Sequence, residues 1–83
     1  MLIVSVAEEL WNSRVLPEGE LTRWRVADGV RVAAGQALAE VRIEDALHEI
    51  TSPGDGVLLR RARVGDVIDP GSRIGWVKPV AAS

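Results

Sequence analysis

The chain has 83 residues and contains no cysteine, phenylalanine or tyrosine. Because cysteine is absent, neither a disulfide framework nor a thiolate metal site can stabilise the fold. A chain of this length forms one domain and buries only about 60 to 65% of the surface that its unfolded form exposes. Stability must therefore come from the packing of a small core, for which the hydrophobic fraction of 47% is sufficient.

An excess of one charge is also lacking, since 10 lysine and arginine residues face 12 aspartate and glutamate residues, for a net charge of -2. This balance gives no general attraction to nucleic acid or to an anionic membrane. The apolar start, residues 1–6, is too short to span a bilayer and has no basic residues before it, unlike a signal peptide. We therefore expect a cytoplasmic protein without membrane or nucleic-acid partners.

Lysine is nearly absent as well. Lys78 is the only one, and the other nine basic residues are arginine. A modification directed at an amine consequently has one side chain and the amino terminus to choose from.

Two segments of the chain, residues 29–41 and 65–77, resemble each other and suggest an internal repeat. Both place two glycines and a valine at matching positions, which is typical of tight turns that need positive φ. The matched pairs are Gly29 and Gly65, Gly35 and Gly71, and Val41 and Val77. In the second segment, Pro70 and Gly71 stand at the two centres of a predicted type II turn.

Apolar residues alternate with polar ones between these turns, as in short half-buried strands. No stretch of a dozen residues keeps a helical apolar stripe without glycine or proline. The pattern predicts an all-β domain with strands of about four to six residues. The two copies of this segment, each with glycines at its turns, further predict two similar sheets related by a pseudo-twofold axis.

Residues 40–50 form the clearest predicted hairpin, with Glu44 and Asp45 as its turn. Antiparallel pairing then places Ile43 opposite Ala46 and Glu40 opposite Glu49. Alternation predicts two sets of side chains. Those expected inside are Val41, Ile43, Ala46, His48 and Ile50, and those expected outside are Glu40, Arg42, Glu44, Leu47 and Glu49. Arg42, diagonal to Glu49, is expected to offset the repulsion between the two glutamates.

The motifs in residues 19–41, 41–53, 52–57 and 65–71 follow one another as in the lipoyl/biotinyl attachment domain family. The chain resembles that family over nearly its whole length, with Trp24 within its Arg-Trp-x-Val motif. The resemblance implies a flattened β barrel or sandwich of two four-stranded antiparallel sheets, a barrel-sandwich hybrid, over residues 1–79. Residues 80–83 would form a short tail.

In lipoyl domains the attachment segment runs acid, Thr or Ser, Asp, Lys, Ala, and the lysine amine is acylated by lipoic acid. Here Glu44, Asp45 and Ala46 occupy the equivalent turn, and Asp45 stands where the lysine belongs. A carboxylate cannot form this amide, so no lipoyl or biotin cofactor is expected. Biotin is disfavoured further because the Met-Lys-Met type setting is absent.

The resemblance therefore implies an unmodified, non-enzymatic binding or assembly module related to the carrier domains of 2-oxo acid dehydrogenase complexes. Its partners would be protein subunits of such a multienzyme complex. The candidate contact residues are Trp11, Glu44, Asp45 and Glu49. The loop that holds Trp11 lies beside the attachment turn in lipoyl domains, which makes Trp11 the best candidate for an exposed contact, although local packing within the loop is the favoured interpretation. Aspartate is also a good turn former in its own right.

Two alternatives stay open: an active lipoyl or biotinyl carrier, and a lipoyl-like domain of a membrane-fusion adaptor, which lacks the lysine legitimately. No catalytic or metal site is expected. His48 is the only histidine, and Ser52 has no glycine-flanked elbow around it. The cluster of Arg60, Arg61 and Arg63 is interpreted as a solvated strand edge.

Overall fold

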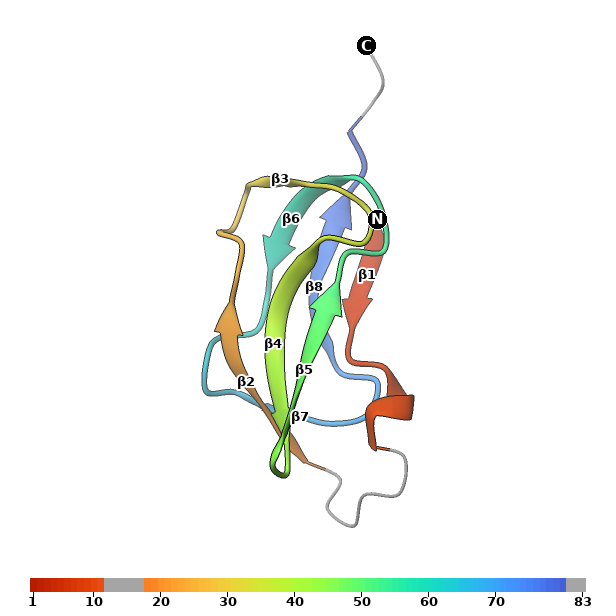
Figure 1. Ribbon diagram of the computed structural model, residues 1–83. Helices are drawn as coiled ribbons and strands as arrows, with labels where there is room; N and C mark the ends of the chain where they lie inside the picture. The colour runs from red at the N-terminus through yellow and green to blue at the C-terminus, as the bar shows by residue number, and fades with distance from the viewer. Residues whose placement is uncertain (12–17, 81–83) are drawn as a thin grey trace.

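The computed structural model describes residues 1–11 and 18–80, and these form an all-β molecule with one short 3-10 helix (Figure 1). Alternation of apolar and polar residues between glycine-containing turns produces the strands, as the sequence predicts. The 3-10 helix is η1, Glu8–Trp11. The strands are β1 (Leu2–Ser5), β2 (Gly19–Trp24), β3 (Arg31–Val32), β4 (Ala37–Ile43), β5 (Ala46–Thr51), β6 (Gly56–Arg60), β7 (Val67–Ile68) and β8 (Arg73–Lys78).

The strands form two four-stranded sheets, and the strand pairs within the described residues are antiparallel. We name them sheet A, with the order β1-β8-β6-β3, and sheet B, with the order β5-β4-β2-β7. The two orders are equivalent: β1, β8, β6 and β3 of sheet A correspond to β5, β4, β2 and β7 of sheet B, four strands apart along the chain. The predicted fold class is thus confirmed, and the topology has the pseudo-twofold relation that it required.

Glycines shape the equivalent turns of the two halves. Gly29, Gly35, Gly65 and Gly71 all have positive φ, between 82° and 95°. In the turn before β8, the amide of Ser72 donates to the carbonyl oxygen of Asp69 at 2.9 Å, with Gly71 at φ 83°. This is the geometry expected of the predicted type II turn.

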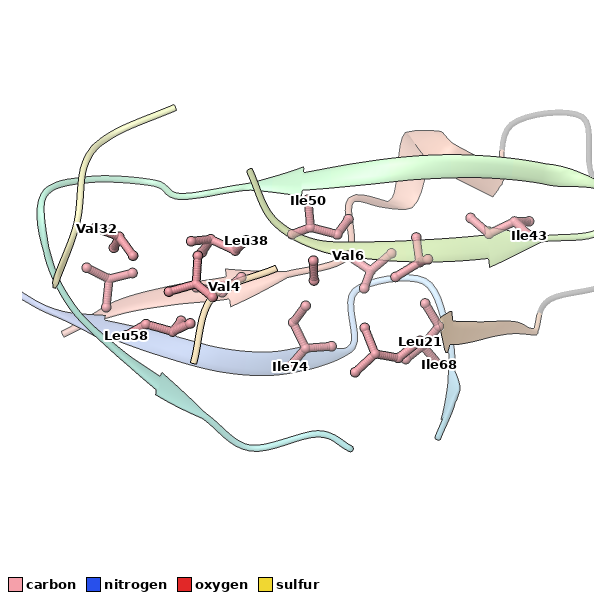
Figure 2. Packing of buried hydrophobic residues seen from close by; sticks show 14 of the residues in the cluster. Val4, Val6, Leu21, Val32, Leu38, Ile43, Ile50, Leu58, Ile68 and Ile74 are labelled. Atoms are coloured by element: carbon pink, nitrogen blue, oxygen red, sulfur yellow. The ribbon is translucent and has the colours of Figure 1, made fainter. Parts of the chain in front are cut away.

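The core lies between the facing surfaces of the two sheets (Figure 2). Its largest fully buried side chains come from both of them: Leu21, Leu38, Val41, Ile43 and Ile68 from sheet B, and Val4, Leu58, Ile74 and Val77 from sheet A. Burying one such side chain stabilises the fold by roughly 1.5 to 3 kcal/mol. Packing of these aliphatic residues supplies the stability that no disulfide can provide.

The same core anchors the hairpin of β4 and β5. Ile43, the last residue of β4, is completely buried. A Cβ atom on Gly19, the first residue of β2, would lie 2.9 Å from the carbonyl oxygen of Arg42 and 3.1 Å from Cγ1 of Ile43. The glycine therefore lets β2 pass close to the base of the hairpin, which holds the β4–β5 turn at one end of the molecule (Figure 1).

Candidate functional site: the turn between β4 and β5

The β4–β5 hairpin has the predicted register. Ile43 pairs with Ala46, Arg42 with Leu47, Val41 with His48 and Glu40 with Glu49. This leaves Glu44 and Asp45 as a two-residue turn, and both are exposed. Glu44 has a φ of 54° and is the only non-glycine residue with positive φ within residues 1–11 and 18–80. A left-handed conformation costs a residue with a Cβ atom roughly 1 to 2 kcal/mol, so the tip of this hairpin is locally strained.

The side chains of the hairpin face as alternation predicts. Val41, Ile43 and Ile50 are buried, whereas Ala46 and His48 are half-buried. On the other face, Leu47 is 59% exposed, and Arg42 and Glu49 are exposed as well. Leu47 is a large apolar side chain beside the acidic turn. The alternation of apolar and polar residues predicts the outward position of Leu47, but no motif in the sequence marks it as a contact residue.

One predicted ion pair is wrong. Arg42 does not reach Glu49 but forms an ion pair with Glu20 of β2 at 2.6 Å. Arg25 contacts both opposed glutamates instead, at 3.5 Å from Glu40 and 3.3 Å from Glu49. The predicted pair considered only β4 and β5. In the structure β2 also lies beside β4, and Arg25, which follows β2, supplies the cation.

Glu40 is also held by a neutral donor. The hydroxyl of Thr22 lies 2.9 Å from the carbonyl oxygen of Glu40 and 3.0 Å from its Oε1. Glu40 is accordingly half-buried rather than exposed. The exposed carboxylates of this hairpin are therefore those of Glu44, Asp45 and Glu49, and Arg25 partly neutralises Glu49.

The contact role considered for Trp11 is not supported, because the residue is buried. Its side chain is only 8% exposed and belongs to the core cluster, because η1 folds this residue back onto the barrel. Trp11 presents no free contact surface, and local packing is the correct interpretation. The surrounding loop, residues 12–17, lies outside the described residues.

The other candidate residues form no reactive site. The Nε2 atom of His48 is buried without a hydrogen-bond partner among the described residues. In the same part of the chain, no group of three or more His, Cys, Asp or Glu residues could hold a metal ion. The hydroxyl of Ser52 donates to the carbonyl oxygen of Gly54 at 2.6 Å. Arg60 and Arg61 lie over two different rings, those of Trp24 and Trp76, and these two arginines and Arg63 are exposed.

Lys78 lies far from the turn. It ends β8 and pairs with Val57, at the same end of the molecule as the amino terminus (Figure 1). The β4–β5 turn is at the opposite end. The Lys78 amine, which is the only one on a side chain, therefore cannot take the place of an amine at this turn.

No helix in residues 1–11 and 18–80 has the length and apolar character needed to cross a bilayer. The cytoplasmic location expected from the sequence stays a prediction.

Comparisons with known proteins agree with this geometry. The chain is 33% identical over 48 residues, or 58% of its length, to the mitochondrial protein X component of the pyruvate dehydrogenase complex of Chaetomium thermophilum. The match spans only 11% of that relative.

Among solved structures, the lipoyl domain of the 2-oxoglutarate dehydrogenase complex of Azotobacter vinelandii superposes with a TM-score of 0.73. The superposition covers 94% of this chain and 99% of that domain, at 15% identity, so it shows the fold alone. The biotin and lipoyl family model, described as "Biotin-requiring enzyme", matches residues 13–76, well over half of the chain. The protein therefore belongs to the lipoyl/biotinyl attachment domain family.

Proposed function

We propose that this protein is a lipoyl-like domain that carries no prosthetic group and acts as a non-catalytic binding module in an assembly related to 2-oxo acid dehydrogenase complexes. The observation that carries the proposal is the β4–β5 turn, which is exposed and built on a rigid core but ends in Glu44 and Asp45 rather than in an amine. Both comparison proteins are components of such complexes by their names.

The geometry supports loss of the carrier chemistry without loss of the fold. A carrier must present its amine where a ligase and successive enzyme sites can reach it, and Asp45 has that exposure. Its carboxylate cannot form the amide. An active carrier would have to use Lys78 or the amino terminus, and both lie at the end of the molecule opposite the turn.

The tip is suited instead to a cationic protein surface. Glu44 and Asp45 place two carboxylates side by side on a strained turn, and the exposed Leu47 adds apolar area next to them. Charge at the rim of a contact mainly sets the rate of association and the choice of partner. Strained backbone is often found at functional sites, which is consistent with a contact role for this turn.

Restoring the amine tests the first half of the proposal. The wild-type protein, incubated with a lipoate ligase, lipoate and ATP, should gain no mass, whereas Asp45→Lys should gain a lipoyl group. Arg42 departs from the acid that lipoyl domains place there, so modification is expected to be slow. The substitution should change the free energy of unfolding by no more than about 0.5 kcal/mol, because the turn is exposed.

Asp69→Lys is the matched control, since it puts the same side chain into an exposed turn before β8. It should stay unmodified. Lipoylation of the wild-type protein would overturn the proposal, and a folded Asp45→Lys variant without modification would show that more than the lysine has been lost.

Binding can be tested with the isotope-labelled domain and a purified 2-oxo acid dehydrogenase component. Amide signals of residues 42–47 should shift on titration, and the shifts should weaken when Glu44 and Asp45 are both replaced by their amides. Shifts that are unchanged by this double substitution would rule out recognition of the acidic tip.

A further inference from the structure

The outer face of sheet A carries a row of apolar side chains that the core does not use. Trp76 of β8 pairs with Ile3 of β1 on one side and with Leu59 of β6 on the other. Partners in an antiparallel pair point to the same face. The next row, Leu58 and Val77, is completely buried, so Ile3, Leu59 and Trp76 must face outward. Ile3 is 45% exposed, and the other two are half-buried.

Cations bracket this row. Arg61 lies over the Trp76 ring, with its Cζ atom 5.8 Å from the ring centroid. A second outward row lies two residues further along the strands, away from Arg61. In this row Val57 of β6 pairs with Lys78 of β8 and with Arg31 of β3, so each end of the row carries a cation. The apolar strip of Val57, Leu59, Trp76 and Ile3 therefore has one cation at one end and two at the other.

No acid on these strands balances these charges. None of the four strands of sheet A contains Asp or Glu. Within residues 1–11 and 18–80, the ion pairs of Arg25 with Glu40 and Glu49 and of Arg42 with Glu20 lie on or beside sheet B. Asp28 and Asp55, which precede β3 and β6, already accept hydrogen bonds at 2.7 Å from the amides of Arg60 and Ala34.

The face is also hollowed where the two rows meet the end of the chain. A depression of about 470 Å³ is lined by Val57, Leu59, Lys78, Pro79 and Val80. It is large enough to accept an aliphatic side chain.

We propose that the outer face of sheet A, defined by Ile3, Val57, Leu59 and Trp76 with Arg31, Arg61 and Lys78, is a docking surface for a partner segment that combines acidic and aliphatic residues. Arg61 and Val57 are four residues apart on or beside β6, or about 13 Å along an extended strand. Two carboxylates with that spacing can meet Arg61 and the pair of Arg31 and Lys78, with an aliphatic residue between them over the depression.

A protein segment fits this face better than a bilayer does. Proteins that rest on membranes bury their apolar face about 5 to 10 Å into the lipid, which needs protruding side chains. Here Leu59, Val57 and Trp76 are half-buried in a sheet surface, and Arg61 covers part of the Trp76 ring. Such a surface is suited to a facing chain, where an aromatic anchor flanked by charges is a common energetic centre.

The test uses the whole chain and the peptide acetyl-Glu-Thr-Leu-Thr-Glu-amide, whose glutamates have the required spacing. We expect amide signals of β6 and β8 and the indole signal of Trp76 to shift on titration. The peptide with glutamine in place of glutamate should bind at least about tenfold more weakly, as expected when two exposed ion pairs are lost.

Two double variants with equal net charge locate the site. Arg31→Gln with Lys78→Gln should weaken binding about tenfold, whereas Arg23→Gln with Arg42→Gln, which removes two exposed cations of sheet B, should leave it unchanged. The first pair should keep the wild-type unfolding midpoint, because neither cation has an ion pair among the described residues.

The proposal would be overturned if no amide signals of sheet A shifted, if the glutamine peptide bound as tightly as the glutamate peptide, or if both double variants weakened peptide binding equally. Shifts of the same signals on dilution of the protein alone would also overturn it, because they would indicate that the face binds a second copy of the chain. Sedimentation of the protein with vesicles of equal parts phosphatidylserine and phosphatidylcholine, lost in the first double variant, would also overturn it and assign the face to lipid. The outcome does not depend on lipoylation at the β4–β5 turn, so this proposal and the proposed function can fail separately.

Discussion

Sheet A and sheet B share a strand order and an inner surface but differ on their outer surfaces. Inside, both contribute fully buried aliphatic side chains to one core. Outside, sheet B carries paired charges and ends in an acidic turn, whereas sheet A carries an apolar strip whose cations have no ion pair within residues 1–11 and 18–80. The inner faces and the glycine turns therefore determine this fold, and the outer faces can differ in charge and apolar character without changing it.

The β4–β5 turn has no counterpart in sheet A. In the pseudo-twofold relation, β4 corresponds to β8 and β5 corresponds to β1. No turn joins β8 to β1, because they are the last and the first strand of the chain. Lys78 accordingly occupies in sheet A the position that Arg42 occupies in sheet B. The candidate site and the only lysine therefore lie at opposite ends of the molecule.

The largest predicted effect tests whether the inner faces are equivalent. Leu21 of β2 and Leu58 of β6 are both completely buried at corresponding positions. Replacing either one by alanine should lower the free energy of unfolding by about 2 to 5 kcal/mol, through lost burial and the cavity left behind. Urea unfolding measures both. A large cost at one position with a cost below about 1 kcal/mol at the other would contradict the equivalence of the two inner faces.

A medium effect separates the two strand tryptophans. Both carry an arginine over the ring, but of the two only Trp24 has an indole hydrogen bond to a described residue, with the carbonyl oxygen of Ala62 as acceptor at 2.9 Å. Trp24→Phe should therefore cost about 1 kcal/mol of stability. Trp76→Phe is the control and should cost less than about 0.5 kcal/mol. Equal costs in thermal unfolding would mean that ring packing, not the hydrogen bond, sets the contribution of Trp24.

The smallest effect concerns the outer charges. Arg25 contacts Glu40 and Glu49, so Arg25→Gln should destabilise the protein by about 0.3 to 1 kcal/mol at low salt. At 1 M salt the difference should largely vanish, because screening weakens exposed pairs. Arg31→Gln on sheet A has no described ion pair to lose and should be neutral at both salt concentrations. A cost for Arg31→Gln as large as that for Arg25→Gln would contradict the difference between the outer faces.

Local patterns in the sequence were enough to predict much of this architecture. The alternation of apolar residues predicted the strands, Pro70 and Gly71 predicted the type II turn, and the register of β4 with β5 followed from treating Glu44 and Asp45 as the turn. Each of these depends on residues that are close in the sequence. Such features can be derived without knowing which strands become neighbours.

Contacts between distant segments could not be derived in this way. The ion pairs of Arg25 and Arg42 depend on β2 lying beside β4, and the burial of Trp11 depends on η1 folding against the barrel. The outer face of sheet A was also missed, because Ile3, Leu59 and Trp76 come from three separate strands. Only the strand order brings them into one row.

The central claim is that this lipoyl-like domain carries no prosthetic group. It is tested most directly by the intact mass of the wild-type chain purified from cells that contain active lipoate and biotin ligases and are supplied with both acids. We expect a mass without a lipoyl or biotinyl increment, from cells in which a genuine lipoyl domain is modified. A discrete lipoyl or biotinyl increment on the wild-type chain, at Lys78 or at the amino terminus, would contradict it.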